Sequence, residues 1–460
     1  MTGTKAGWLV PILAFVLGIH LWAAAVTIRH SNQDQTASDQ GAEMWLSGGA
    51  REDWYPQRSD GVRHPLYSWA VSGLYSDDNA VFFERGKWAN TILCLVFLSA
   101  LGIVAARSLD PLALANLLML CSLGILLVRG TYFQPEPLYY ITFFVAAVCS
   151  WRILRAQTLP VWLYPVFGLS LALAFLSKPS LLPYLAVFCG ALALRTLLSL
   201  RAEGMGFAKR WVGVVGAFAL MALMVAPLGL FTKTHFGRAF FNYPQVWMWM
   251  DDFEKEAWPW QTKYPSGREM ALLDKKDIPS ASWYFARHTV GDAANRLWHG
   301  VTEVKTRFLY PEKKLSSRAF FWKKEVKNWQ QPLAHRGTYL VILSALCLIL
   351  AIFGWRKVAP LLVRPENLAC AALVFGTFAV YLTLYGWYYP IGKGDRFMGS
   401  LWIPAVCLVF WAAVKLSTKS GTTGSRLYFG VHSALLLSLL LQSASLLWLF
   451  THGVYLTTRN

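Results

Sequence analysis

Charge is scarce in this chain. Only 15% of its 460 residues are Asp, Glu, Lys or Arg, whereas 55% are hydrophobic and 15% are aromatic. Apolar side chains in that proportion expose far more surface than one soluble core can bury, which excludes an ordinary water-soluble protein. The chain also lacks an internal repeat, a Gly-rich phosphate loop and a low-complexity linker, so nothing indicates a repeat protein or a nucleotide-binding domain.

Cysteine is also sparse, and its positions carry little information. The seven cysteines lie in or beside apolar runs, and their spacing matches no metal-ligand pattern. They are expected to be small core side chains, and they predict no disulfide framework. The chain also contains no Asn-x-Ser/Thr sequon, which favours a bacterial plasma membrane over an endoplasmic reticulum.

Long hydrophobic runs, in contrast, are abundant. Runs of about 17–25 residues, each long enough to cross about 30 Å of hydrocarbon as a helix, recur along nearly the whole chain. The predicted fold class is all-α: a polytopic transmembrane helical bundle of about eleven spans with two long external loops that contain interfacial helices. The spans are expected near 8–27, 89–106, 111–128, 137–151, 160–177, 180–198, 211–231, 338–355, 367–386, 397–414 and 427–451.

The formal net charge of +18 has to be interpreted by where the basic residues lie. Many fall in short connections on one side of this topology, which is the positive-inside pattern and needs no nucleic-acid partner. It predicts an integral multi-pass protein with a cytoplasmic N-terminus and an external active site, and it leaves open whether the first helix is cleaved. The residues are Arg107, Arg152, Arg155, Arg195, Arg201, Lys209, Arg210, Arg356, Lys357, Arg364, Lys415, Lys419 and Arg426.

Two polar segments are too long to be simple connections, and they divide the chain. Residues 1–231 are expected to form an N-terminal transmembrane catalytic module that includes a first external loop at 28–88. Residues 232–337 form an external amphipathic loop rich in aromatic residues, which are typical of the lipid–water boundary and would cover the site. Residues 338–460 supply the C-terminal transmembrane helices.

The first external loop opens with acidic residues. Asp34 follows the first span by a few residues, and an amphipathic helix that carries Asp39 and Glu43 comes next. A carboxylate beside a low-dielectric surface can act as a general base, because partial burial moves its pKa toward the working range. Asp is also a favoured N-cap, so a purely structural role for Asp34 at the start of this helix stays open.

The same loop ends with two residues suited to anion or sugar binding. Arg63 can hold a phosphate through two hydrogen bonds, and His64 can donate a hydrogen bond or move a proton near neutral pH. Pro65 suits the first turn of a helix that re-enters the membrane. The alternatives are an Arg that reaches to the interface and a His that caps the helix.

A second carboxylate lies in a short external loop. Glu136 is placed between Pro135 and Pro137, which fix the backbone around it. Such a loop can bring Glu136 beside Asp34 to bind a cation or to orient an acceptor. Alternatively, Glu136 is an ordinary acidic residue at a helix start, favoured by the helix dipole.

Two further charged positions lie at external ends of spans. Lys178 and the Asp395–Arg396 pair each stand beside helix-breaking Pro or Gly, where an ionisable group is costly and is therefore a candidate for function. Together they could clamp a lipid-attached phosphate. A local Asp395–Arg396 ion pair and a Lys178 that reaches to the interface are the structural alternatives.

These segments together resemble the GT-C class of membrane glycosyltransferases, which includes protein O-mannosyltransferases and aminoarabinose transferases. Members open the first external loop with an acid followed by a helix with Ala and Gly, re-enter with Pro-Leu-Tyr, end an apolar helix with Ser/Thr-Lys, and carry a late Gly-Asp-Arg-Phe-like step. The matching positions are Asp34, Ala42 and Gly48, then His64-Pro65-Leu66-Tyr67, Ser177-Lys178 and Gly394-Asp395-Arg396-Phe397.

The resemblance implies transfer of a sugar from a polyprenyl-phosphate-linked donor to an acceptor hydroxyl of a protein, lipid or glycan at the external membrane face, with inversion. Asp34 would be the catalytic base and Glu136 an orienting or metal-binding acid. Substrate would be bound by Asp39, Arg63, His64, Lys178, Asp395 and Arg396.

The resemblance implies no definite cofactor, and binding of a divalent cation is left as an open alternative. Many members of the class have paired acids where this chain has Asp34-Gln35, so one of the two acidic ligands is missing here. The expected partners are membrane lipids and the polyprenyl-phosphate-linked sugar. The alternative function is a transporter or lipid-sugar flippase, although the chain shows no symmetric halves and its candidate polar groups gather at one face.

Overall fold

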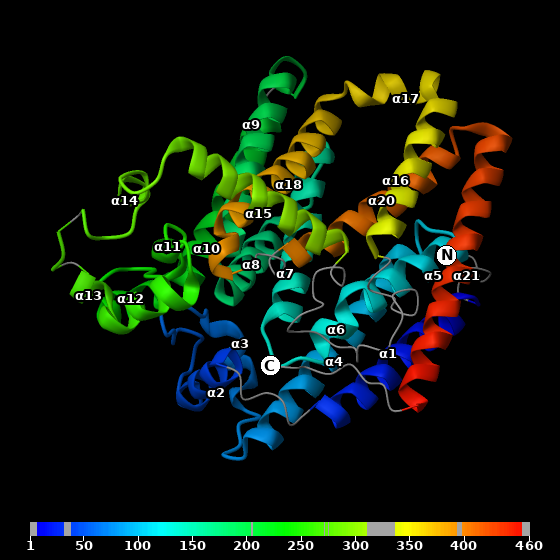
Figure 1. Cartoon of the computed structure of the whole chain (residues 1–460). Coiled ribbons are helices and arrows are strands. Elements are labelled where there is room, and N and C mark those ends of the chain that lie inside the picture. Colours follow the sequence, from blue (N-terminus) through cyan, green and yellow to red (C-terminus); the bar gives the residue numbers. More distant parts are fainter. Residues whose placement is uncertain are drawn as a thin grey trace.

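The computed structural model describes residues 7–31, 38–203, 206–270, 272–274, 276–310, 336–392 and 398–452. Within these ranges the chain forms helices and turns and no strand (Figure 1). Ten of the described helices are long and apolar enough to cross a membrane, and Leu163–Ser177 is a shorter apolar helix. The predicted all-α, polytopic architecture is therefore confirmed, and the predicted span at 160–177 corresponds to the short helix Leu163–Ser177.

The apolar bundle contains thirteen elements, of which α5, η2 and α6 form one continuous span. They are α1 (Leu9–Ser31), α4 (Asn79–Ala105), α5 (Pro111–Cys121), η2 (Ser122–Leu126), α6 (Leu127–Gly130), α7 (Glu136–Arg155), α8 (Leu163–Ser177), α9 (Leu182–Glu203), α10 (Gly206–Phe236), α16 (Arg336–Phe353), α18 (Pro365–Gly392), α20 (Trp402–Ser417) and α21 (Gly421–Thr451).

Shorter helices fill the two long polar segments and the turns. The first segment contains α2 (Ser38–Ala50) and α3 (Pro65–Ser72). The second contains α11 (Pro244–Trp247), η4 (Phe253–Ala257), α12 (Trp258–Lys263), α13 (Gly267–Met270), α14 (Ala281–Phe285) and α15 (Val290–Leu309). The remaining ones are η3 (Pro179–Leu181), α17 (Trp355–Leu362) and η8 (Gly399–Leu401).

Contacts between helix ends show how the bundle alternates. Lys178, just after α8, meets Glu136 at the start of α7, whereas Arg195, late in α9, donates to the carbonyl of Ile153 near the end of α7. Neighbouring helices α7 and α8 are therefore antiparallel, and connections alternate between two ends of the bundle. We call the end that carries α2, α3 and the start of α7 the site end.

Basic side chains cap helices at the opposite end. Arg195 and Arg210 both donate to the carbonyl of Ala156, just beyond the last turn of α7. Cations at a helix C-terminus satisfy carbonyls that lack a helical partner and interact favourably with the helix dipole. Some of the basic residues of this chain, such as Arg195 and Arg210, therefore stabilise helix ends within the described bundle.

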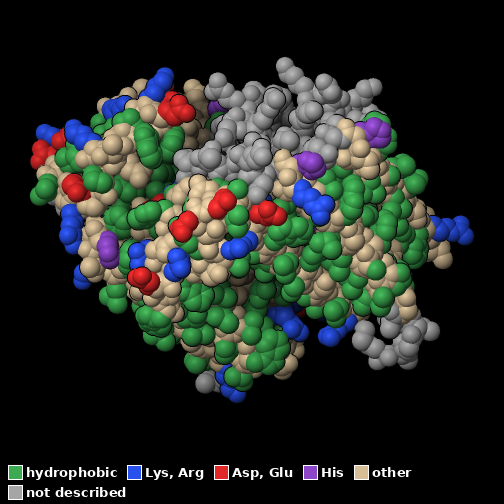
Figure 2. Space-filling model, turned by 90° about the horizontal axis from the view of Figure 1, so that it is seen from below, with side chains coloured by type: hydrophobic (Ala, Val, Ile, Leu, Met, Phe, Trp, Pro, Cys, Tyr) green, Lys and Arg blue, Asp and Glu red, His purple; other side chains and the backbone are tan. Residues whose placement is uncertain are grey.

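The second long segment folds into a layer at the site end. Its later part forms two helices, α14 and α15, because Thr289 starts a new helix through a reciprocal capping box with Asp292. The helix α15 packs closely along α18, and Figure 1 shows α11 to α14 beside that pair. Figure 2 views this end and shows charged side chains of both signs among hydrophobic ones.

The aromatic part of this segment has a core of its own. Phe241, Tyr243 and Trp247 are buried together with Met250 and Ile391, whereas Trp258 is 55% exposed. Most of these aromatic side chains therefore stabilise the fold of the layer, because a buried ring removes a large apolar area from water.

The contact between α15 and α18 predicts a packing-sensitive position. A methyl group on Gly300 would overlap the carbonyl of Gly386, whereas a methyl group on Gly216 would meet nothing within 4 Å. Gly300→Ala should therefore lower the free energy of unfolding by about 1–3 kcal/mol through overpacking. Gly216→Ala should raise it by about 0.5–1 kcal/mol. Thermal unfolding in detergent micelles measures both, and a neutral Gly300→Ala would contradict the close approach.

Candidate functional site

The structure brings four of the predicted site residues to the site end. Arg63, His64, Glu136 and Lys178 come from the α3 entry, the α7 start and the α8 end. Asp34, Asp395 and Arg396 lie outside the described residues. Asp39 lies in the first turn of α2, and its side chain is not among those described.

The centre of the site is an ion pair between two helix ends. Lys178 Nζ donates to Glu136 Oε1 at 2.5 Å, and the Glu136 side chain is fully buried while that of Lys178 is 10% exposed. Pro179 follows Lys178 and disfavours a helical backbone there, so α8 ends and Lys178 is extended. Glu136 occupies the first turn of α7, where the helix dipole favours an anion. The predicted acid and cation are therefore partners of each other.

A tight loop orients Arg63. Asp60 Oδ1 accepts hydrogen bonds from the backbone nitrogens of Val62 and Arg63, and Asp60 Oδ2 lies 2.6 Å from Arg63 Nη1. Gly61, at a φ of 80°, turns the chain and accepts a hydrogen bond through its carbonyl from Tyr243. The aromatic layer therefore packs on the loop that carries Arg63.

His64 is held as a neutral ring. Its Nδ1 lies 2.5 Å from the carbonyl oxygen of Phe175, and since a carbonyl only accepts, Nδ1 carries the proton. Burial lowers the pKa of His64 to about 4, against a smaller opposing effect of this hydrogen bond. The neutral ring thus offers Nε2 as an acceptor. The expectation that His64 donates to substrate or moves a proton near neutral pH does not fit this geometry.

Glu43 is a further acidic residue of the site, and its sequence position on the helix after Asp34 did not indicate this role. This carboxyl is buried on the inner face of α2, and Ser68 Oγ of α3 donates to its Oε2 at 2.5 Å. Burial raises the pKa of Glu43 to about 7, while Ser68 and Arg63 act in the opposite direction and Asp60 and Glu136 add to the rise. Glu43 is therefore electrostatically linked to Arg63 and to Glu136.

Neutral hydrogen bonds tie these charged groups together. Asn90 of α4 donates to the hydroxyl of Tyr67 and to the carbonyls of Tyr132 and Gln134, the loop that leads into Glu136. Lys87, one turn earlier on α4, is also fully buried. The sequence predicted α4 only as a membrane span. One face of α4 in fact supports both α3 and the start of α7.

The carboxylates in the described part of this site are engaged by neighbouring side chains. The described residues contain no group of three His, Cys, Asp or Glu side chains that could hold one. Glu136 Oε1 is engaged by the ammonium group of Lys178, and Glu43 Oε2 by Ser68. Glu136 Oε1 thus has a cationic side chain as its partner, and Asp34, with which Glu136 was predicted to bind a cation, lies outside the described residues.

Comparison with solved structures places this fold among known proteins. The archaeal oligosaccharyltransferase AglB from Archaeoglobus fulgidus, solved with an inhibitory peptide and a dolichol-phosphate, aligns with a TM-score of 0.51 and 12% identity over 97% of this chain. Two structures of ArnT from Cupriavidus metallidurans, one apo and one bound to undecaprenyl phosphate, align with TM-scores of 0.34 and 0.32 at 14% identity. They cover 85% and 84% of this chain, and 78% and 77% of ArnT. No protein-family model and no curated protein matches the sequence.

The AglB alignment defines the class of fold. Because the identity is only 12%, this alignment establishes a shared fold and nothing more. The chain spans 56% of the length of the AglB chain. The chain therefore shares a polytopic helical fold with the aligned part of the AglB chain. The ArnT alignments score too low to add to this conclusion.

The buried ion pair predicts strong coupling between its members. Lys178→Met removes the ammonium partner of a buried carboxylate and should destabilise the fold by about 3–5 kcal/mol. Combining it with Glu136→Gln should restore part of that loss, because no carboxylate then stays buried without its cation. Unfolding of the two single variants and the double variant gives the coupling. Lys276→Met, which breaks an exposed pair with Asp274, is the control and should leave stability unchanged. Additive losses would contradict the pairing.

The raised pKa of Glu43 predicts a pH-dependent stability. Between its ordinary value of 4.5 and about 7, the folded protein retains a proton that the unfolded chain has lost. Stability from this group is fully present below about pH 4.5 and is lost as pH rises through about 7, by up to about 3 kcal/mol. Glu43→Gln should therefore flatten the fall in unfolding temperature between about pH 5 and about pH 8. An unchanged slope would show that Glu43 ionises normally.

Proposed function

We propose that this protein is a membrane glycosyltransferase that moves a sugar from a polyprenyl-phosphate-linked donor to an acceptor hydroxyl, with inversion at the anomeric carbon. The observation that carries the proposal is the buried Lys178–Glu136 pair, which lies with Arg63 and Glu43 at one end of an apolar bundle of the GT-C fold. A lipid-linked phosphate presents its head group at such an end of a bundle. AglB, whose fold this chain shares, was solved with a dolichol-phosphate.

The reaction needs a base on one side of the sugar and cations on the other. The acceptor oxygen forms a bond to the anomeric carbon, and its proton passes to a carboxylate, for which we propose Asp34. The bond from that carbon to the phosphate oxygen breaks, and the electron pair leaves with the lipid phosphate. Positive charges placed where this negative charge develops lower the barrier, while the sugar passes through an oxocarbenium-like state.

Arg63 and Lys178 are suited to hold the leaving phosphate. Asp60 fixes the guanidinium of Arg63 from one side, and Glu136 fixes the ammonium of Lys178. Each cation is therefore positioned before substrate arrives, which spares the cost of ordering a long side chain during the reaction. Arg396 remains a proposed third cation, and Asp39 and Asp395 remain proposed substrate contacts. Glu136 acts in this scheme as the residue that positions Lys178.

The uncharged polar groups of the site can bind the sugar. His64 Nε2 can accept a hydrogen bond from a sugar or acceptor hydroxyl, since its Nδ1 proton is committed to Phe175. Glu43, with its pKa near 7, carries a proton in part of the molecules at neutral pH, so its carboxyl can donate or accept.

The charge distribution supports a location for this chemistry. The basic connections lie at the end opposite the site, and basic connections favour the cytoplasmic side of a membrane. We therefore propose that the site end faces outward from a bacterial plasma membrane and that the acceptor is delivered there. The chain is an integral multi-pass membrane protein.

The direct test incubates the purified full chain in detergent with a panel of polyprenyl-phosphate sugars and an acceptor mixture, and measures release of free lipid phosphate. Arg63→Gln should reduce release by about 10²–10³-fold, because it removes a cation from the developing phosphate charge. Arg58→Gln is the matched control, since Arg58 lies on the same loop and pairs with Asp53. It should retain activity.

The same assay separates the proposal from its alternative. A flippase would move the intact lipid-linked sugar across a vesicle membrane and release no lipid phosphate. Absence of release with every sugar, or equal losses in the two arginine variants, would count against the transferase.

A further inference from the structure

A helix at the end of the bundle opposite the site end has the form of a membrane-surface helix. The helix α17 joins α16 to α18 there, away from α2 and α3 (Figure 1). Both neighbours are long and apolar enough to cross a membrane, so α17 lies where one span leaves the apolar region and the next one enters it. That level is the boundary between hydrocarbon and lipid head groups.

One face of α17 is apolar. Trp355, Val358 and Leu362 recur at helical spacing, and Val358 is buried, whereas Trp355 and Leu362 are 55% and 51% exposed. Phe353, which ends α16, and Val363, which follows α17, are exposed as well. Exposed apolar side chains between two membrane-spanning helices contact lipid, and Trp is typical of the lipid–water interface. The apolar face of α17 is therefore suited to lie among acyl chains.

The other side of α17 is basic, and a second connection adds to it. Arg356 and Lys357 are exposed on that side. A methyl group on Gly354, just before α17, would lie 3.4 Å from the carbonyl of Lys419, so this connection touches the one between α20 and α21. The two connections present six cations, which we call the basic surface: Arg356, Lys357, Arg364, Lys415, Lys419 and Arg426.

The basic surface has no counter-charge among the described residues. Residues 354–364 and 415–426 contain no Asp or Glu. None of the six side chains forms an ion pair or a hydrogen bond with a described residue, whereas Arg195 and Arg210 at the same end donate to the end of α7. Like charges on two touching connections repel one another, so an anion from outside the chain would stabilise them.

The acidic residues next to these connections have other roles. Glu366 lies in the first turn of α18, where the helix dipole favours an anion. Asp110 accepts hydrogen bonds from the backbone nitrogens of Leu112 and Ala113 at the start of α5, and its second oxygen accepts from the hydroxyl of Tyr428. The basic surface is therefore open to an anionic ligand.

The two sides of α17 together select a membrane as the partner. A soluble polyanion such as nucleic acid would neutralise the cations but leave Trp355 and Leu362 in water, whereas a bilayer covers both sides. A zwitterionic phospholipid carries its own cation beside its phosphate. A phospholipid with a net negative head group leaves that charge for Lys and Arg, and basic segments at a membrane surface are attracted to such lipids.

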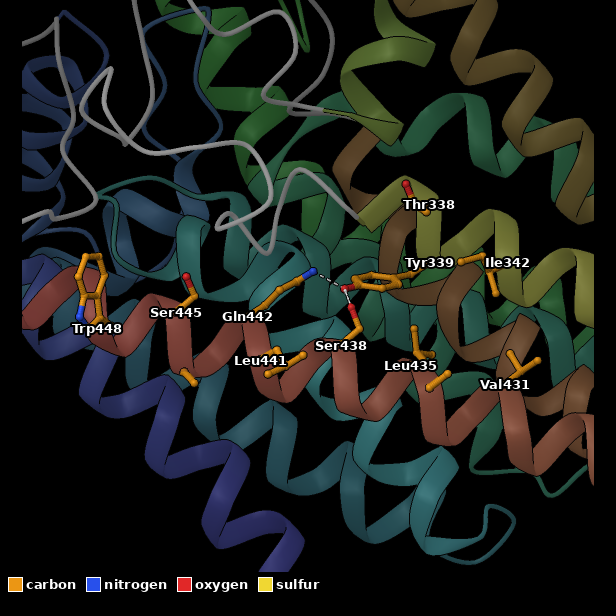
Figure 3. Close-up of a pocket in the computed structure, with 12 residues that line it drawn as sticks. Thr338, Tyr339, Ile342, Val431, Leu435, Ser438, Leu441, Gln442, Ser445 and Trp448 are labelled. Atoms are coloured by element: carbon orange, nitrogen blue, oxygen red, sulfur yellow. Dashed lines mark hydrogen bonds between the residues drawn. The ribbon is translucent and has the colours of Figure 1, made fainter.

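An uncharged surface at the other end of the bundle provides a reference. A groove between α16 and α21 is lined by no charged residue among those described, and Tyr339, Ser438 and Gln442 bond to one another at the middle of its length (Figure 3). Trp448 lines the groove near the site end and is 54% exposed, much as Trp355 is on α17. The two tryptophans thus sample opposite leaflets, one beside the basic surface and one beside uncharged residues.

We infer that the basic surface binds anionic phospholipid head groups of the leaflet opposite the site end. The helix α17 lies in the interface, with Trp355 and Leu362 among the acyl chains, and Arg356 and Lys357 donate hydrogen bonds to head-group phosphates. This inference does not depend on the proposed transferase activity, because it uses no residue of the charged site.

Photolabelling of the unaltered full chain tests the inference. The protein is reconstituted into phosphatidylcholine nanodiscs that contain, at equal mole fraction, either a phosphatidylglycerol or a phosphatidylethanolamine probe. Each probe has a diazirine in an acyl chain next to the glycerol, and peptide mass spectrometry locates the adducts. We expect the phosphatidylglycerol probe to label residues 355–363 about 3–10-fold more than the other probe, relative to Trp448. The same probe ratio at both places would overturn the inference.

Salt provides a second measurement on the same unaltered chain. Raising the ionic strength from about 0.1 M to about 1 M shortens the screening length from about 10 Å to about 3 Å. The preference for phosphatidylglycerol at residues 355–363 should then fall toward one. A preference that does not change with salt would show that charge is not its cause and would overturn the inference.

Charge-removing variants provide the third arm. Arg356→Gln combined with Lys357→Gln should lower the preference by about 3-fold or more, because it removes both cations from α17. The matched control is Lys233→Gln combined with Arg238→Gln, which removes the same charge from two exposed positions at the site end and should leave the preference unchanged. Equal preferences in the unaltered chain and the α17 variant, or an equal fall in the control, would overturn the inference. If the α17 variant fails to insert, the salt dependence of the unaltered chain decides.

Discussion

The buried ion pair between Lys178 and Glu136 is the constraint on which the rest of this structure depends. Removing two charges from water costs several kcal/mol per ion, and their attraction offsets this only when geometry is fixed and neighbouring polar groups are satisfied. The chain meets this requirement with proline. Pro179 ends α8 so that Lys178 is extended, and Pro135 and Pro137 set the start of α7 so that Glu136 points inward. A cation that could otherwise reach water is thereby held among apolar helices.

Neutral hydrogen bonds extend this fixed centre to the rest of the site. Asn90 connects the loop before α7 to Tyr67 of α3, and Ser68, the next residue, donates to Glu43 of α2. The loop before α3 carries Arg63 and is packed against the aromatic layer through Tyr243. Several separate segments of the chain therefore share one arrangement of charge, and a shift of any one segment alters the field at the others. This is a means to hold cations in place for an anionic substrate.

The sequence predicted the elements of this structure better than their pairing. Apolar run length located the spans, and helix-breaking prolines correctly marked the ends that carry Glu136 and Lys178, because both signals are local. The ion pair joins positions 42 residues apart and depends on how α7 and α8 pack, which no local pattern states. Glu43 was recognisable as acidic, but only its helical phase with the buried Gln40 and Ser47 places it on the inner face of α2. The aromatic segment looked interfacial because composition alone does not distinguish a ring that faces lipid from one that folds a layer.

Fixed charge also gives the site end a means to distinguish a lipid-linked phosphate from other membrane lipids. Bilayer hydrocarbon is common to both, so apolar contacts cannot discriminate, and selection must come from the polar end of each ligand. At the site end, Lys178 and Arg63 are each held by a carboxylate, so an incoming phosphate adds a second anion to a cation that is already placed.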